Sequence, residues 1–292
     1  MSFGVFLAVL SAAFLHAGWN AIVKMGMSKQ TSMFLLSVGH ALIGIAVALG
    51  KPLPQAEVWP WLLASGLIHM AYQLFLAFAY EQGDLSRVYP IARGAAPMIV
   101  TVFSVLFLSD PMAPMEYAGV LVLGLGIAFM ARGVFSNGES RRLLPFAFGS
   151  AVATAGYTLA DGLGARVAGD PLQYVGWLMI LSAVFYTPAA IALRGPGVMR
   201  ADARQWAFGL VAAAASFAAY AIAVWAMTVA PLALVAALRE TSILFAVLLG
   251  WLLFGDRMDR GRVISPRMSA CSTCVRIVST PPGHPPRPTV CW

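Results

Sequence analysis

Nine apolar stretches, each about as long as a membrane is thick, follow one another along this chain with short connections between them. They run approximately over residues 3–23, 32–49, 59–80, 88–108, 115–131, 144–160, 172–193, 205–228 and 232–254. The hydrocarbon core of a bilayer, about 30 Å thick, is crossed by about 20 residues of helix, and a helix satisfies its own backbone groups there. We therefore predict an all-α integral membrane protein with about nine transmembrane helices.

The composition supports this class, because 60% of the residues are hydrophobic and 11% are charged. A soluble globular domain has roughly 25% charged residues. The formal net charge of +7 could suggest nucleic acid, but in a membrane protein positive charge first reports orientation. We expect the chain to sit in a lipid bilayer, as a multi-pass protein of the cell (inner) membrane, without a nucleic-acid partner.

Lysine and arginine are distributed unequally between alternate connections, and these residues prefer the cytoplasmic side of a membrane. The connections of one set, which starts after the first stretch, hold twelve: Lys24, Lys29, Arg87, Arg132, Arg141, Arg142, Arg194, Arg200, Arg204, Arg257, Arg260 and Arg262. The other set holds Lys51 and Arg166. This pattern predicts that the N-terminus lies outside.

The two halves of the chain match each other when the sequence is compared with itself. A shift of 146 positions aligns Arg93 with Arg239, Asp110 with Asp256 and Met112 with Met258. A shift of 138 aligns residues 17–20 and Gly26 with residues 155–158 and Gly164. Because five helices per copy is an odd number, the second copy enters the membrane from the opposite face. The sequence thus predicts two inverted five-helix repeats, which are typical of transporters.

Three segments carry a resemblance to a known family: residues 16–24 (HAGWNAIVK), 85–97 (LSRVYPIARGAAP) and 239–256. Over about residues 1–264 the chain resembles the drug/metabolite transporter superfamily, EamA type. The resemblance implies ten helices in two repeats around a central cavity, and import or export of small metabolites such as amino acids, often coupled to protons. It also implies cytoplasmic termini, whereas the charge pattern places the N-terminus outside.

The sequence departs from that family where a tenth helix is expected. We divide the chain into a first repeat (1–132), a connecting loop (133–143), an incomplete second repeat (144–264) and a disordered tail (265–292). The tail holds all three cysteines and six of the eighteen prolines. Its C-x-x-C pair, Cys271 and Cys274, does not match a usual zinc pattern. We expect no metal and no cofactor, and hypothesise that the tail is a shifted reading frame or a cloning remnant.

Two arginines, Arg93 and Arg239, interrupt long apolar stretches. Charged side chains in a membrane usually face the protein interior or an aqueous pathway. Since guanidinium pairs well with carboxylate and phosphate, an anionic or zwitterionic, amino-acid-like substrate is one explanation. The alternative is an internal ion pair, for which Glu240 and Asp161 are the available carboxylates, with Lys24 as an alternative cation for Glu240.

Polar and aromatic side chains share one helix face in two further places. In the first stretch these are His16, Trp19, Asn20 and Lys24, and in the third His69, Tyr72, Gln73 and Tyr80. Such faces should point into the bundle, where they either line a cavity or form hydrogen bonds between helices. Our candidates for the cavity are Arg93, Arg239, His16, Trp19, Asn20, Tyr72, Gln73, Tyr89 and Tyr157.

For proton coupling the candidates are Glu240 and His16, while His40 and His69 are assigned to hydrogen bonds within the bundle. Pro90 and Pro97 bracket Arg93 and predict a broken fourth helix beside a buried charge.

The resulting functional prediction is a secondary transporter that moves a small molecule by alternating access, with proton-coupled export as one mode and a homodimer as one assembly. An enzyme is the alternative, because Asp161, Gly162, Ala165 and Arg166 resemble the D-G-x-x-A-R start of membrane CDP-alcohol phosphotransferases. The further positions of that motif hold Val175, Met179 and Ala183 in place of its glycine and metal-binding carboxylates. A structural membrane protein is the remaining alternative.

Resequencing of the coding DNA tests the hypothesis about the tail. A shifted frame predicts that an adjacent reading frame, from about the codon of Ile264 onward, encodes an apolar helix of about 20 residues. If neither adjacent frame encodes such a helix, the hypothesis is wrong.

Overall fold

The computed structural model describes residues 1–24, 29–82, 85–108, 110–136 and 143–254. The chain divides into two compact units, Met1–Leu249 and Gly250–Trp292, and the packing below is that of the first. Its helices are α1 (Phe3–Lys24), α2 (Lys29–Leu49), η1 (Ala56–Val58), α3 (Trp59–Gln82), α4 (Leu85–Phe107), α5 (Pro114–Ser136), α6 (Leu143–Ala168), α7 (Pro171–Arg194), η2 (Pro196–Met199), α8 (Ala203–Val229) and α9 (Leu232–Arg239). A further helix, α10, covers Ser242–Phe254.

The first eight predicted stretches each coincide with one helix, and the part of the chain that the structure describes contains no strand. The all-α prediction is therefore confirmed. One difference concerns the last stretch, which we predicted as a single helix over 232–254 and which the structure divides between α9 and α10. The tail at 265–292 lies outside the described residues, so the hypotheses about it and about the tenth helix stay untested.

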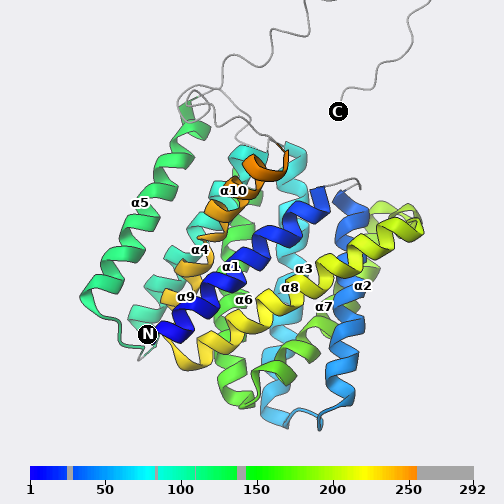
Figure 1. Ribbon diagram of the computed structural model, residues 1–292, viewed down its shortest axis with the longest axis horizontal. Coiled ribbons are helices and arrows are strands. Elements are labelled where there is room, and N and C mark those ends of the chain that lie inside the picture. Colours follow the sequence, from blue (N-terminus) through cyan, green and yellow to red (C-terminus); the bar gives the residue numbers. More distant parts are fainter. Residues whose placement is uncertain (25–28, 83–84, 109, 137–142, 255–292) are drawn as a thin grey trace, which may run out of the picture. The chain divides into compact units, whose positions relative to one another are not determined.

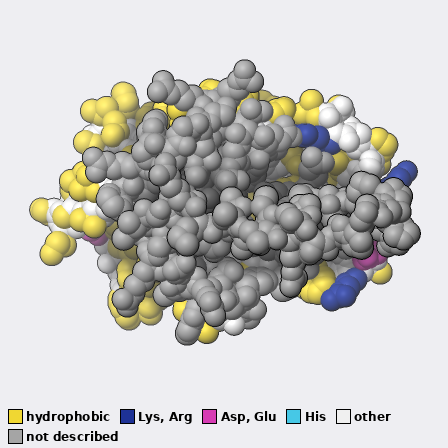
Figure 2. Space-filling view, turned by 90° about the horizontal axis from the view of Figure 1, so that it is seen from above, with side chains coloured by type: hydrophobic (Ala, Val, Ile, Leu, Met, Phe, Trp, Pro, Cys, Tyr) yellow, Lys and Arg dark blue, Asp and Glu magenta, His cyan; other side chains and the backbone are white. Residues whose placement is uncertain are grey.

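The apolar character of the helices fits a membrane. Within the described residues, four spans are both long and apolar enough to cross one: Phe3–Val23, Thr31–Leu49, Pro171–Arg194 and Ala203–Val229. Large apolar side chains lie exposed on the outer faces of several helices, among them Leu42, Ile45, Val102, Val184, Val211 and Val229. Where described residues are visible in Figure 2, hydrophobic side chains dominate and Lys and Arg side chains stand near the edge. Exposed apolar surface of this kind is what lipid tails would cover.

The helix packing repeats itself when five is added to each helix number. Helix α3 packs on α6 and on α7, and α8 packs on α1 and on α2 in the same way. Helix α4 packs on α6 as α9 packs on α1, while α2 with α7 and α4 with α9 are pairs of equivalent helices. In Figure 1 α1 and α8 accordingly run side by side. The internal sequence matches thus correspond to a duplicated packing pattern.

The two copies run in opposite directions. Near the start of α1, Val5 and Val9 share a hydrophobic cluster with Met227 and Ala230. Near the end of α6, Arg166 donates hydrogen bonds to the carbonyl oxygens of the same Met227 and Ala230, at 2.9 and 3.2 Å. The beginning of α1 therefore lies at the same place as the end of its equivalent, α6. The predicted inversion of the repeat is confirmed.

Glycine allows close contact where the equivalent helices α2 and α7 meet. A Cβ atom added to Gly44 would lie 2.5 Å from the carbonyl oxygen of Gly176. This is closer than real side chains approach a backbone, so the two helices meet along small residues, as is common in membrane proteins.

The N-terminus of α7 is tied to the connection between α2 and α3. Asp170 caps the helix by accepting hydrogen bonds from the backbone N–H groups of Leu172 and Gln173, and it also pairs with Lys51. Partial burial by itself raises the pKa of Asp170, but hydrogen bonds from Lys51 and the helix backbone outweigh it and lower the pKa below its usual value. The carboxylate form is therefore favoured in the folded state.

Asp170 offers a test of this link through pH. The variant Asp170→Ala should lose about 1 kcal/mol of unfolding free energy, because it removes the cap. Asp170→Asn keeps a capping oxygen and removes only the charge. A lowered folded-state pKa stabilises the protein above the unfolded-state pKa, and the stabilisation is lost as pH falls through the folded-state value.

Thermal unfolding of the purified protein in detergent, followed between about pH 7 and about pH 3, measures both effects. At neutral pH, wild type should have a higher melting temperature than Asp170→Asn. At acidic pH, this difference in melting temperature should disappear. Equal melting of the two proteins at every pH would show that the charge of Asp170 contributes nothing.

Candidate functional site

A buried carboxylate, that of Asp161 in α6, lies where four helices meet. Its side chain is fully buried. Oδ1 accepts a hydrogen bond from the hydroxyl of Tyr174 in α7 at 3.1 Å, and Oδ2 accepts one from the hydroxyl of Tyr220 in α8. Nε2 of His69 in α3 lies 4.0 Å from Oδ2. A buried carboxylate is costly unless it is hydrogen-bonded or paired, so these contacts fix the rotation of all four helices.

Aromatic rings surround the imidazole of His69. Its ring stacks on Tyr157, with centroids 4.1 Å apart, and meets the ring of Tyr220 edge-on at 5.8 Å. Tyr72 packs edge-on against the far side of this group, 5.5 Å from Tyr157. The Nδ1 atom of His69 lies 3.0 Å from the carbonyl oxygen of Ser65, one turn earlier in α3. The histidine is thus held in one orientation from both ends of its ring.

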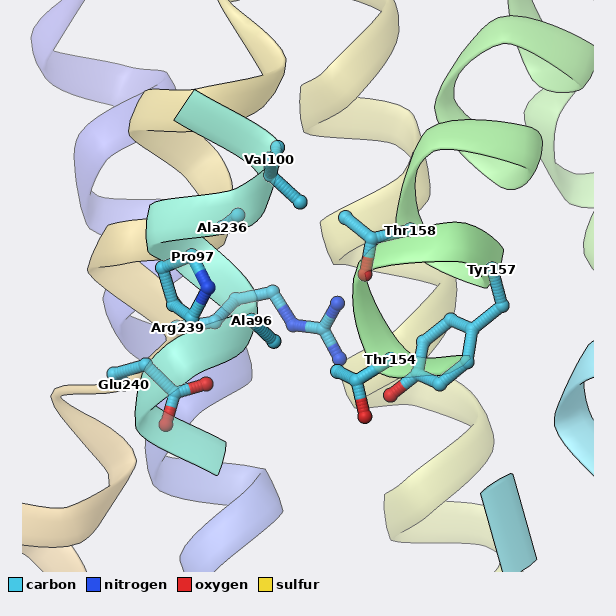
Figure 3. Close-up of a pocket in the computed structure, with 9 residues that line it drawn as sticks. All are labelled: Ala96, Pro97, Val100, Thr154, Tyr157, Thr158, Ala236, Arg239 and Glu240. Carbon is cyan, nitrogen blue, oxygen red and sulfur yellow. The ribbon is translucent and has the colours of Figure 1, made fainter. Parts of the chain in front are cut away.

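A pocket adjoins this buried group, between α4, α6 and the end of α9. Its lining residues are Ala96, Pro97, Val100, Thr154, Tyr157, Thr158, Ala236, Arg239 and Glu240. Figure 3 shows the Arg239 side chain extending across the pocket toward Thr154, Thr158 and Tyr157, with Glu240 at another edge. The free space amounts to about 10 Å³, close to what a single water molecule requires.

Arg239 is the cation of this pocket. The Cζ atom of its guanidinium lies 5.2 Å from the centroid of the Tyr220 ring, which is a cation–π contact. Among the side chains that the structure describes, no carboxylate lies within ion-pair distance of Arg239. Tyr220 therefore bears the cation on its ring face while its hydroxyl donates to Asp161.

The helix is interrupted beside this arginine. Helix α9 ends at Arg239, and α10 begins at Ser242. The N–H of Glu240 donates to the carbonyl of Ala237, and the hydroxyl of Thr241 donates to that of Leu238 at 2.7 Å. The backbone bonds here, including those from Thr241 to Leu238 and from Ile243 to Glu240, span three residues instead of the four of an α-helix, so the chain tightens between α9 and α10 without proline.

The predicted break in the fourth helix is wrong. Helix α4 continues from Leu85 to Phe107 through Pro90 and Pro97. The carbonyl of Pro97 accepts a hydrogen bond from the hydroxyl of Thr101 at 2.7 Å. Proline is tolerated in membrane helices when Ser or Thr side chains and neighbouring helices satisfy the backbone groups nearby. The two copies do differ, but the interrupted helix is the one that carries Arg239.

Of the predicted site residues, Arg239, Tyr157 and Glu240 line the pocket, and Tyr72 reaches it through Tyr157. Gln73 lies half-buried in α3, one residue after Tyr72. The side chains of Arg93 and Tyr89 in α4 lie outside the described part. Whether any of these residues binds substrate stays a prediction.

The polar and aromatic residues predicted to share one face of α1 form a group apart from the pocket. Trp19 is buried against Leu36 of α2 and Ala212 and Ala213 of α8. The His16 ring meets it edge-on at 5.2 Å, and the Asn20 amide donates to the His16 carbonyl at 2.7 Å. These three residues are not among those that line the pocket.

Sequence reasoning missed Thr154 and Thr158, although the repeat contained the signal. The shift of 138 positions that aligns Trp19 with Tyr157 also carries His16 onto Thr154 and Asn20 onto Thr158. The polar face of α1 thus has its equivalent in α6, and Asp161 continues that face one turn further. Asp161 itself entered only as an ion-pair partner for Arg239 and as part of the enzyme motif.

The residues of that motif have structural roles here. Arg166 binds Asp110 with both terminal nitrogens, each at 2.9 Å. A side chain at Gly162 would collide with Leu232 at the start of α9. Asp161 and Arg166 therefore face different partners, and the described residues include no group of three or more His, Cys, Asp or Glu placed to hold a metal.

Comparison with known proteins gives a consistent result. A model of the EamA-like transporter family matches residues 2–132 and 142–275. A protein of Sinorhizobium sp., described as an uncharacterized transporter in the cobO 3′ region, is 32% identical over 136 residues, which make up 43% of this chain and 94% of that protein. A solved structure described only as the crystal structure of a protein is similar with a TM-score of 0.67 and 19% identity, and the match covers 89% of this chain and 92% of that one. This last likeness shows a shared fold.

The Arg166–Asp110 pair should stabilise the end of the protein where α6, α8 and α9 meet. We expect Asp110→Asn and Arg166→Gln to lower the unfolding free energy, and the double variant to lose less than the sum. A coupling of about 1 to 3 kcal/mol fits a bidentate, partly buried pair.

A double-mutant cycle on thermal or denaturant unfolding measures this coupling. Additive losses would show that the two residues act independently and that the pair does not hold these helices together.

Proposed function

Because this chain belongs to the EamA-like transporter family and is a multi-pass membrane transporter, we propose that it carries a small zwitterionic or anionic metabolite through the pocket around Arg239. The amino-acid class is the best fit. We further propose the cell (inner) membrane as its location.

The observation that supports this substrate class is the Arg239 guanidinium, which extends into the pocket and pairs with no carboxylate among the described side chains. A permanently charged group in a membrane interior needs a counter-charge, and a substrate carboxylate or phosphate provides one with matching geometry. Glu240 lines the same pocket and is the counterpart for a substrate ammonium group. The hydroxyl of Thr154, which already donates to the Ser150 carbonyl, can accept from the substrate.

Transport would proceed by alternating access. The pocket has room for about one water molecule, so a metabolite can enter only when the surrounding helices move apart. Its walls come from α4 and α9, which are equivalent in the two copies, together with α6. Rocking of one inverted copy against the other would open this region to either side of the membrane in turn.

Thermal-shift screening of the purified protein against amino acids, organic acids and phosphorylated metabolites tests the proposal, since ligands of the folded state raise its melting temperature. At least one compound should stabilise wild type, and Arg239→Gln should weaken its binding at least about tenfold, the loss of a charge-assisted contact. The same variant should lose flux of that compound in proteoliposomes.

Arg204→Gln is the matched control, because Arg204 also lies over an aromatic ring, that of Phe208, at 5.5 Å, but at the start of α8 and outside the pocket. Equal binding and flux in wild type and Arg239→Gln would refute the proposed substrate site.

A further inference from the structure

The Asp161–His69 pair lies behind the pocket wall and has no role in the substrate contacts above. Nδ1 of His69 lies 3.0 Å from the carbonyl oxygen of Ser65, which can only accept a hydrogen bond, and 3.2 Å from the Ser65 hydroxyl, which can accept one as well. We therefore assign the ring hydrogen to Nδ1. In the neutral imidazole this leaves Nε2 as an acceptor. Nε2 faces Oδ2 of Asp161 at 4.0 Å.

Two acceptors that face each other in a buried place repel, and a single proton on either of them removes the conflict. With that proton the pair has no net charge, whether the proton sits on His69 or on Asp161. Without it the pair carries one negative charge. The geometry therefore favours a group that takes up and releases one proton.

The charged and titratable groups around the pair come from each helix packed against it. They are His40 of α2, Tyr72 of α3, Tyr157 of α6, Tyr174 of α7, Tyr220 of α8, and Arg239 and Glu240 at the end of α9. Glu57 of η1 is exposed, and α4 has no titratable side chain in its described part from Gly94 onward. Arg239 is thus the one permanent cation among these described neighbours.

Tyr220 joins this cation to the pair. Its hydroxyl donates to the same Oδ2 that faces His69, and its ring supports the guanidinium of Arg239. When the pair is deprotonated, its negative charge balances Arg239. When the pair is protonated, the charge of Arg239 becomes available to an anion in the pocket.

We infer that the Asp161–His69 pair is a proton-binding site, and that a proton on this pair and a substrate carboxylate on Arg239 favour each other's binding. The inference rests on the proposed function for the identity of the anion. Since such coupling is reciprocal, the substrate also promotes protonation. A proton and an anion that bind together cross the membrane in the same direction, which fits uptake driven by an inward proton gradient.

Acid–base difference infrared spectroscopy on the full chain in lipid nanodiscs, without substrate, tests the site. Wild type should show a protonation signal, from a carboxylic acid or from an imidazolium, that is absent in Asp161→Asn and altered in His69→Gln. Asp110→Asn removes a carboxylate that is paired with Arg166 and should retain the signal. If the spectra of Asp161→Asn and His69→Gln equal that of wild type, the pair binds no proton.

Arg239→Gln supplies a second readout that leaves both members of the pair intact. Removal of the cation should make the proton harder to release and move the midpoint of the signal to higher pH by about one unit. Arg204→Gln should leave it in place. An unchanged midpoint in Arg239→Gln would overturn the coupling.

No substrate or transport enters this measurement. Failure of the ligand screen would therefore refute the substrate proposal without moving the infrared signal, and loss of the signal would refute the proton site while substrate binding at Arg239 persists.

Discussion

The requirement that no polar group be left unsatisfied inside a membrane organises this structure around Asp161. A carboxylate buried within α6 needs partners from other helices. Tyr174 and Tyr220 donate hydrogen bonds to it from α7 and α8, and His69 faces it from α3. Because these partners come from both copies of the repeat, the same contacts that satisfy the carboxylate also hold the two copies together.

The repeat is a scaffold on which the two copies have acquired different chemistry. The packing pairs are symmetric, since α3 packs on α6 as α8 packs on α1. The polar faces of the equivalent helices α1 and α6 are not symmetric, because α1 buries Trp19 against α2 and α8, while α6 presents Thr154 and Thr158 to a pocket. Likewise α4 is continuous, whereas its counterpart is interrupted after Arg239. The duplicated packing thus positions the pocket, while the residues that line it differ between the two copies.

At the end of the protein where α1 begins, the basic side chains form ion pairs. The two basic residues assigned to that side, Lys51 and Arg166, are both paired, with Asp170 and Asp110. The prediction that the N-terminus lies outside rests on the many basic residues in the other connections. The pairs at the first end also restrain the helix connections that would have to move if the pocket opened there.

The sequence by itself determined the class of fold, the number of apolar stretches and the inverted duplication, because hydropathy and internal similarity are properties of residues close together in the chain or aligned by a fixed shift. It also singled out Arg239, Tyr157 and Glu240, since charge and polarity are conspicuous in apolar surroundings. Only the tertiary structure decided which groups meet. Tyr220 and Asp161 are 59 positions apart, and whether their side chains touch depends on how far each helix is rotated about its axis. That rotation is set by packing and burial across several helices at once, so the break after Arg239 and the Asp161–His69 pair could not be derived from any one segment.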